Sequence, residues 1–366
     1  MSDLFSSAAL GPLTLPHRIM MAPLTRSRAD DATDVPSEMA ITYYEQRAGA
    51  SLIIAEATQI NPEGKGYIRT PGIYDDAQVK QWKKITDVVH TKKGRIFLQL
   101  WHVGRISHTS FQPDGKQPLA PSAIRADVDA FTNDGKEPCS EPRAMTQDDI
   151  TRTVADYKKA AQLAKDAGFD GVEVHAANGY LINQFLSDGS NHRDDAYGGN
   201  DEARAKFLFD VMDAVLSVWD SNCVGIRLSP TGTFNDVSQS DPLAQYSYVI
   251  EKLNTLDLAY LHFVERFPGI DVSNEDLAIV NDLRQQWKGF YIANGDYDFL
   301  KAKQAVESGH ADAVTFGRPY IANPDLAERF KQGAELNEPD HDTFYGGGAE
   351  GYIDYPFLGE KKQDAA

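Results

Sequence analysis

Eight short apolar runs recur along this chain, and each is followed by a longer segment with the period of a helix. Strands of a parallel sheet are buried on both faces, so they form nearly continuous apolar stretches rather than alternating ones. This alternation favours an α/β fold, either a (β/α)8 TIM barrel or an open doubly wound sheet. The runs cover residues 19–24, 51–60, 95–102, 171–177, 224–230, 258–265, 289–295 and 311–318.

The segment between the third and fourth runs predicts the clearest helix. Thr146 is a good N-cap, Asp148 and Asp149 suit the first-turn dipole, and Gly168 ends the pattern. One face of this segment is apolar, at Ile150, Val154, Tyr157, Ala161 and Ala164.

The barrel is the better of the two architectures, because no G-x-G-x-x-G motif follows an early strand. A barrel also accounts for 366 residues as one unit, so we expect a single domain over residues 1–358 and a flexible tail over 359–366. The segment 103–144 is too long for an ordinary loop. We expect this excursion after the third strand to cover the mouth of the barrel.

The excess of acidic residues limits the classes of partner that the chain can bind. A net charge of −18 and a pI near 4.9 have the wrong sign for a nucleic-acid or anionic-membrane partner. Cys139 and Cys223 match no metal or redox spacing, and there is no signal peptide or apolar run of ~18 residues. We therefore expect a cytoplasmic protein with a small-molecule substrate, either a monomer or a homodimer.

Polar residues gather where the apolar runs end, which in a TIM barrel is the position of the active site. A lone polar residue at a strand end usually makes local hydrogen bonds, but here the pattern repeats around the barrel. The endings are Pro23-Leu24-Thr25-Arg26, Glu56-Ala57-Thr58-Gln59, Gln99-Leu100-Trp101-His102, His175 to Tyr180, Arg227-Leu228-Ser229-Pro230, Asn294-Gly295-Asp296 and Gly317-Arg318-Pro319.

The glycine-containing ends of the seventh and eighth runs indicate a phosphate site, since backbone N–H groups there can form an anion nest. Arg318 adds a charged donor directly after Gly317. A phosphosugar enzyme and a flavin enzyme both fit this pattern.

Several motifs follow one another along nearly the whole chain. They are MAPLTR (21–26), YYEQRA (43–48), EAT (56–58), QLWHVGR (99–105), HAANGYLINQFL (175–186), N-x-R-x-D-x-YGG (191–199), RLSP (227–230), FGRPYIANPDL (316–326) and FYGGGAEGYIDYP (344–356). In these motifs the chain resembles the old yellow enzyme family, which consists of FMN-containing TIM-barrel oxidoreductases. The resemblance runs in order over about residues 3–358 and is diffuse only at 232–290.

The resemblance implies non-covalently bound FMN, with NADPH or NADH as the reductant. It implies that Thr25 donates a hydrogen bond near flavin O4 and that the fixed charge of Arg227 stabilises the anionic reduced flavin. It further places Pro23, Ala57 and Gln99 beside the flavin ring, and Gly295, Asp296, Gly317 and Arg318 at the phosphate.

The resemblance also implies the substrate side of the site. His175 and Asn178 would bind the activating oxygen of an α,β-unsaturated carbonyl, maleimide, nitroalkene or nitrate ester, and Tyr180 would donate a proton. The H-x-x-N-x-Y spacing serves these roles if the strand turns into a loop after His175. Tyr67, Trp101 and Tyr345 would shape the substrate face.

Two departures from the family pattern bear on specificity. The phosphate turn reads Asn-Gly-Asp instead of a glycine-richer form, so Asp296 would offer its backbone N–H with its carboxylate turned away. Asn178 stands where part of the family has a second His, which we expect to shift substrate preference rather than abolish the reaction.

Other interpretations stay open at this point. His102, His108 and His192 show no metal-ligand spacing, so we expect no metal, and Arg193 with Asp195 predicts a structural pair at the rim. A barrel lyase or isomerase for a phosphorylated metabolite is one alternative, although no run ends in Lys. A non-catalytic flavin-binding protein is another, although holding flavin requires neither the donor pair nor Tyr180.

Overall fold

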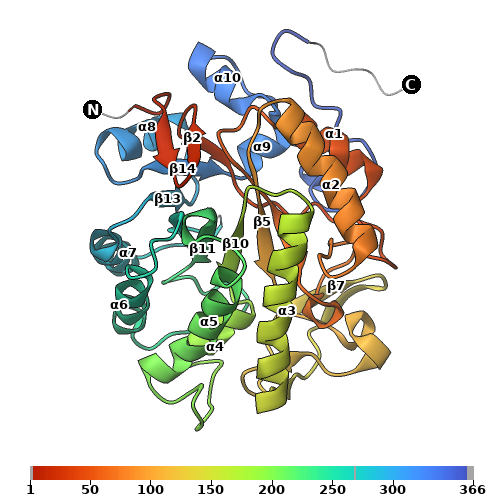
Figure 1. Ribbon diagram of the computed structural model, residues 1–366, viewed down its shortest axis with the longest axis vertical. Coiled ribbons are helices and arrows are strands. Elements are labelled where there is room, and N and C mark those ends of the chain that lie inside the picture. Colours follow the sequence, from red (N-terminus) through yellow and green to blue (C-terminus); the bar gives the residue numbers. More distant parts are fainter. Residues whose placement is uncertain (1–2, 268, 361–366) are drawn as a thin grey trace.

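A closed barrel of eight parallel strands forms the centre of the molecule, with helices around it (Figure 1). The computed structural model describes residues 3–267 and 269–360. Around the barrel the strands follow one another in chain order, and the last of them, β14, pairs with the first, β3. The predicted TIM barrel is confirmed, and the open doubly wound sheet is excluded. The predicted tail 359–366 falls mostly outside the described residues.

Each barrel strand lies within one of the apolar runs. The strands are β3 (Ile19–Met21), β4 (Ile53–Gln59), β5 (Ile96–Trp101), β10 (Gly171–Ala176), β11 (Val224–Leu228), β12 (Tyr260–Val264), β13 (Tyr291–Asn294) and β14 (Ala313–Phe316). The helices are α1 (Glu38–Gln46), α2 (Asp76–Thr91), α3 (Gln147–Asp166), α4 (Leu181–Leu186), α5 (Asp201–Leu216), α6 (Pro242–Leu253), α7 (Asn274–Gln286), α8 (Phe299–Glu307), α9 (Arg318–Ala322) and α10 (Leu326–Gln332).

Helix α3 illustrates how the sequence specifies these elements. Thr146 caps it by accepting a hydrogen bond from the Asp149 backbone N–H, and the Asp149 carboxylate accepts one from the Thr146 backbone N–H. Gly168 follows the helix with φ +82°, a conformation that favours glycine. The apolar face packs on the barrel, with Ile150, Tyr157, Ala161 and Ala164 buried.

The amino end of the barrel is closed by a hairpin that the sequence analysis did not identify. Strands β1 (Ala8–Leu10) and β2 (Leu13–Leu15) pair antiparallel. Leu10 and Leu15 of this hairpin pack against Met20, Phe97 and Tyr260 from the barrel. The candidate active site lies at the opposite end of the barrel, at the carboxyl ends of the strands.

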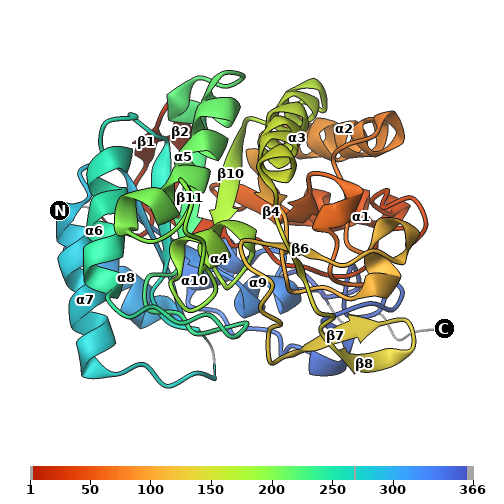
Figure 2. The ribbon, with the colours of Figure 1, turned by 90° about the horizontal axis from the view of Figure 1, so that it is seen from below.

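The excursion after β5 folds into small structures of its own. Strands β7 (Asp129–Thr132) and β8 (Gly135–Pro138) form a hairpin that stands out from the barrel in Figure 2, while β6 (Leu119–Ala120) pairs with β9 (Arg143–Ala144). Ala126, Ala130 and Cys139 of the excursion share a buried cluster with Trp101 and Tyr180. The excursion therefore covers part of the mouth, as expected.

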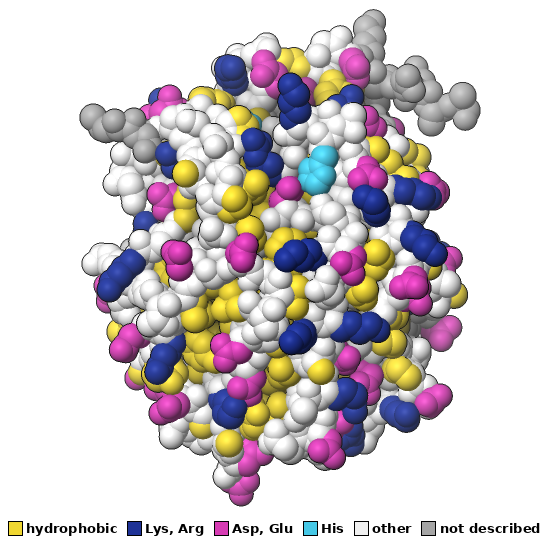
Figure 3. Space-filling model, in the orientation of Figure 1, with side chains coloured by type: hydrophobic (Ala, Val, Ile, Leu, Met, Phe, Trp, Pro, Cys, Tyr) yellow, Lys and Arg dark blue, Asp and Glu magenta, His cyan; other side chains and the backbone are white. Residues whose placement is uncertain are grey.

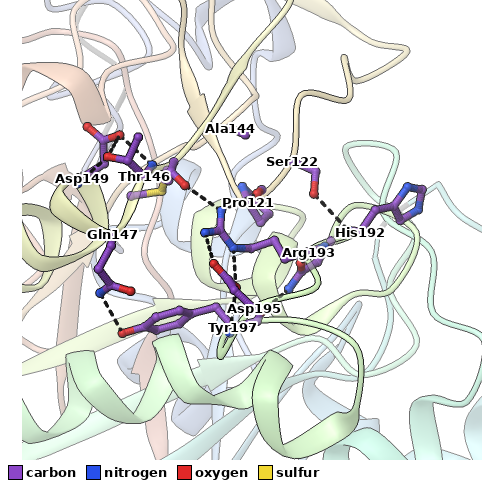
Figure 4. Close-up of polar contacts among 12 residues, drawn as sticks. Pro121, Ser122, Ala144, Thr146, Gln147, Asp149, His192, Arg193, Asp195 and Tyr197 are labelled. Carbon is purple, nitrogen blue, oxygen red and sulfur yellow. Dashed lines mark hydrogen bonds and ion pairs between the residues drawn. The ribbon is translucent and has the colours of Figure 1, made fainter.

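The rim loop after α4 is fixed by the predicted pair of Arg193 and Asp195. The guanidinium donates to both carboxylate oxygens of Asp195, at 3.0 and 2.5 Å. It also donates to the carbonyls of Pro121 and Met145, at 2.9 and 2.7 Å, which ties the loop to the excursion (Figure 4). This arrangement confirms a structural role for the pair.

Acidic and basic side chains are interspersed over the face in Figure 3, with no extended area of one sign. Across residues 3–267 and 269–360, no helix is both long and apolar enough to cross a bilayer. The same residues contain no group of three or more His, Cys, Asp or Glu side chains placed to hold a metal ion.

Candidate active site

The carboxyl ends of the strands bring the predicted residues together across neighbouring strands. His175 of β10 lies in register with Arg227 of β11, and Arg227 with His262 of β12. The Arg227 guanidinium also donates to Asn294 Oδ1 of β13, at 2.7 Å. These contacts place the polar residues of four successive strands at one end of the barrel.

The chain turns sharply after β10, as the H-x-x-N-x-Y spacing requires. Asn178 and Gly179 both adopt positive φ, +59° and +73°. The turn is held by hydrogen bonds from the Asn178 backbone N–H to Ser229 Oγ and from the Gly179 N–H to Asn183 Oδ1, both 2.8 Å. His175 Nδ1 and Asn178 Oδ1 are buried without a hydrogen-bond partner among the described residues, which is typical of groups that meet a ligand.

Tyr180 lies in an aromatic cluster at the mouth. Its ring meets the rings of Trp101 and His175 edge-on, with centroids 5.0 and 5.2 Å apart, and its hydroxyl is 3.1 Å from the Tyr67 hydroxyl. Tyr67 in turn stacks on Trp101 at 5.7 Å. Burial raises the pKa of Tyr180 to about 12, so the phenol carries its proton at neutral pH.

His175 and Arg227 differ in their charge at neutral pH. Burial, followed by the positive charge of Arg227, lowers the pKa of His175 well below its ordinary value, so this imidazole is neutral at neutral pH. Burial also lowers the pKa of Arg227, but Glu173 opposes the shift and a guanidinium stays protonated in proteins. Arg227 therefore supplies a fixed positive charge among neutral donors.

The turn after β13 carries Gly295 and Asp296, two of the residues that the sequence analysis placed at the phosphate. Gly295 has φ +146°, and a Cβ there would lie 2.5 Å from the backbone nitrogen of Arg266. Asp296 follows with φ +57°, and its carbonyl accepts from Lys301 Nζ at 3.3 Å. Two successive positive-φ residues turn the backbone sharply at the strand end.

The remaining predicted residues occupy different environments. Gly317 precedes α9, and Arg318, the first residue of that helix, is exposed. Ala57 is buried in β4, where the register against β5 shifts between Ala55 and Thr58. Pro23 and Thr25 are half-buried after β3, whereas Tyr345 is 71% exposed and is not part of the aromatic cluster around Tyr180.

Sequence reasoning missed a second set of polar residues inside the barrel. Glu173 and His262 are fully buried, and Glu173 accepts a hydrogen bond from the predicted flavin contact Gln99 at 2.7 Å. A glutamate inside the apolar run 171–177 and a histidine inside 258–265 were the available signals. Asn235 was also missed; its side chain donates to the Asn178 carbonyl at 2.8 Å.

Comparison with known proteins agrees with this geometry. The family model described as the NADH:flavin oxidoreductase / NADH oxidase family matches residues 3–337. The chain belongs to this family.

Its relatives share nearly the whole length. A putative 12-oxophytodienoate reductase 2 of Oryza sativa subsp. japonica is 43% identical over 97% of this chain and 94% of the relative. A probable flavin mononucleotide-dependent alkene reductase of Leishmania infantum is 42% identical over 95% and 96%. Morphinone reductase superposes with a TM-score of 0.93 at 50% identity, covering 98% of this chain and 96% of the other.

Membership in the NADH:flavin oxidoreductase / NADH oxidase family decides between the interpretations that the sequence left open. The chain is an FMN-dependent, NAD(P)H-dependent oxidoreductase of the old yellow enzyme type. This assignment replaces the phosphometabolite lyase or isomerase and the non-catalytic flavin-binding protein as interpretations of the same strand ends.

Proposed function

We propose that this protein reduces the C=C bond of α,β-unsaturated carbonyls, maleimides or nitroalkenes. The observation that carries the proposal is the placement of His175, Asn178 and the protonated Tyr180 in and directly after the end of β10, with the His175 and Tyr180 rings 5.2 Å apart. Relatives with 12-oxophytodienoate reductase and alkene reductase names support the same reaction class.

The residues at the strand ends fit FMN. Arg227 Nε is buried without a hydrogen-bond partner among the described residues, so a flavin oxygen or nitrogen can take that place. Gln99 and Arg227 would hold the pyrimidine ring, with Pro23, Thr25 and Ala57 beside it. Gly295, Asp296, Gly317 and Arg318 would hold the phosphate. When bound, FMN supplies an acceptor for the hydride of NADPH or NADH and a donor of hydride to the alkene.

His175 and Asn178 bind the activating oxygen of the substrate. His175 is held in strand β10 and Asn178 in the hydrogen-bonded turn after it, so these neutral donors need no rearrangement as negative charge builds on that oxygen. Removing one donor of this kind typically costs ~10²–10³ in rate.

Tyr180 delivers the proton to the carbon next to the activating group. Its hydroxyl stays protonated at neutral pH and lies beside the Tyr67 hydroxyl. An enolate is basic enough to take a proton from a phenol. Tyr67 and Trp101 form the adjoining wall, and Tyr345, which interacts electrostatically with Tyr180, would complete the substrate face.

Anaerobic reductive titration tests the function directly. The purified yellow protein should lose its flavin absorbance with NADPH or NADH under nitrogen and regain it on addition of cyclohexenone, N-ethylmaleimide or a nitroalkene. A colourless protein that cannot be reconstituted with FMN, or one whose melting temperature rises with a sugar phosphate instead, would contradict the proposal.

The proposal includes three further statements. The protein works in the cytoplasm, it is a monomer or a homodimer, and residues 1–358 form one domain. Size-exclusion chromatography with light scattering tests the second, and limited proteolysis tests the third, since a single domain should resist internal cleavage.

A further inference from the structure

Two layers of polar side chains lie inside the barrel beneath the mouth. Side chains from strands β5, β11 and β13 form the upper layer, and side chains from the alternate strands β10, β12 and β14 form the lower one, which is the usual layering of barrel interiors. The upper layer is Gln99, Arg227 and Asn294; the lower layer is Glu173, His262 and Thr315.

A continuous chain of hydrogen bonds joins the two layers. Gln99 Nε2 donates to Glu173 Oε1 at 2.7 Å, and His262 Nδ1 lies 2.8 Å from Glu173 Oε2. His262 Nε2 lies 2.9 Å from the Thr315 hydroxyl. Glu173 and His262 are both 0% exposed, so no water competes for these bonds.

The carboxylate at the centre of this chain is ionised. Burial alone would raise the pKa of Glu173, but the hydrogen bonds from His262 and Gln99 and the charge of Arg227 hold it below its ordinary value. Burial lowers the pKa of His262, so the imidazole is neutral. Because a carboxylate only accepts, the Nδ1 proton must point to Glu173, and Nε2 then accepts from Thr315.

The buried negative charge of Glu173 is costly to desolvate, and it has two effects on the upper layer. It holds the NH2 group of the Gln99 amide toward Glu173, so the amide oxygen of Gln99 remains available to a ligand. It also opposes the positive charge of Arg227, with which it interacts electrostatically.

We propose that Glu173 is a positioning residue for FMN, which orients the Gln99 amide and partly offsets the charge of Arg227, and so sets how strongly the bound FMN takes up electrons. The inference rests on the proposed placement of FMN against Gln99 and Arg227. FMN gains a net negative charge when it takes up two electrons and one proton. A nearby carboxylate disfavours that gain and a guanidinium favours it.

The replacement Glu173→Gln removes the charge and keeps the shape. The carbonyl of the new amide can accept from Gln99, and its NH2 group can donate to His262 Nδ1 once the imidazole proton moves to Nε2 and points to Thr315 Oγ1. The fold should therefore survive. The midpoint potential of the bound FMN should rise by about 30 mV or more, which is a tenfold stronger preference for the reduced form in a two-electron couple.

A second buried carboxylate provides the matched control. Glu265, 8% exposed, accepts from the Tyr291 hydroxyl and pairs with His310 Nε2, both at 2.7 Å. Neither contact involves Gln99 or Arg227. Glu265→Gln should leave the FMN potential at the wild-type value. If the potential rises as much as in Glu173→Gln, removal of any buried carboxylate has the same effect, and the assignment of Glu173 is overturned.

The potentials are measured by anaerobic reduction against a reference dye, together with the FMN dissociation constant and circular dichroism. An unchanged potential in folded Glu173→Gln overturns the inference. If that variant does not fold, Glu173→Asp carries the test. It keeps the charge but shortens the reach to Gln99, so FMN should bind at least tenfold more weakly at an unchanged potential, and unaltered binding would overturn the inference.

Arg227→Gln separates this inference from the proposed FMN placement. It should lower the potential or weaken FMN binding at least tenfold. If it does so while Glu173→Gln changes nothing, the placement stands and the role of Glu173 fails. If neither variant alters the potential or the binding, the FMN placement itself is wrong.

Discussion

Tyr180→Phe is the sharpest test of how the site divides its work. The substitution removes one hydroxyl, which lies 3.1 Å from the Tyr67 hydroxyl and also interacts with the Asn235 side chain. The ring keeps its edge contacts with Trp101 and His175, at centroid distances of 5.0 and 5.2 Å. The variant should therefore fold with the same aromatic cluster.

The expected effects on stability and on rate differ in size. A neutral hydrogen bond contributes about 1 kcal/mol to stability, so the melting temperature should fall only slightly. A general acid contributes ~10²–10⁴ in rate, which corresponds to about 3–5 kcal/mol of barrier. A rate loss of that size cannot come from the small loss of stability.

Stopped-flow measurement of the two half-reactions provides the assay. Reduction of the flavin by NADPH or NADH should be unchanged, because no proton from Tyr180 is needed there, and oxidation by an enone should slow by ~10²–10⁴. Hydride transfer to a nitroalkene should be spared, because its product anion is stable enough to be protonated in water. Tyr67→Phe is the matched control and should have a much smaller effect. Slowing of flavin reduction alone by Tyr180→Phe would refute the assigned role.

Three further variants test other parts of the structure. Asn178→Gly suits the φ of +59° and removes the amide, so kcat/KM for enones should fall ~10²–10³ with little change in melting temperature. Burial raises the pKa of Glu56 to about 7 against an unfolded value of ~4.3, so the folded protein holds a proton that the unfolded chain has lost. Stability should fall as pH rises from ~4.3 to 7, by up to about 4 kcal/mol, and melting curves of Glu56→Gln should lose this slope. Arg105, 1% exposed, donates to the carbonyls of Ile124 and Asp236, so Arg105→Met should speed hydrogen exchange at both segments.

The barrel was predictable because its signals are local. Strands that are buried on both faces read as apolar runs, and Thr146 with Asp149 marks the start of α3 in four residues. The sequence located the excursion but did not predict its strands, although Asn133-Asp134-Gly135 is a recognisable turn signal between β7 and β8. The hairpin at the amino end has only three residues in each strand, too few for a periodic pattern.

The residues of the candidate site were predictable where they follow the ends of strands. The polar contacts inside the barrel were not predictable from the sequence. A Glu inside an apolar run tells only that a charge is buried, and the partners of Glu173 lie 74 and 89 residues away in the chain. No spacing rule relates positions on β5, β10 and β12, because their separation depends on the lengths of the loops and helices between them. Only the curvature of the closed barrel brings the alternate strands β10 and β12 into side-chain contact, and with them Glu173 and His262. The two variants therefore test different kinds of prediction. Tyr180→Phe tests a role that the H-x-x-N-x-Y motif indicates in the sequence, whereas Glu173→Gln tests a role that depends on contacts formed in the folded barrel.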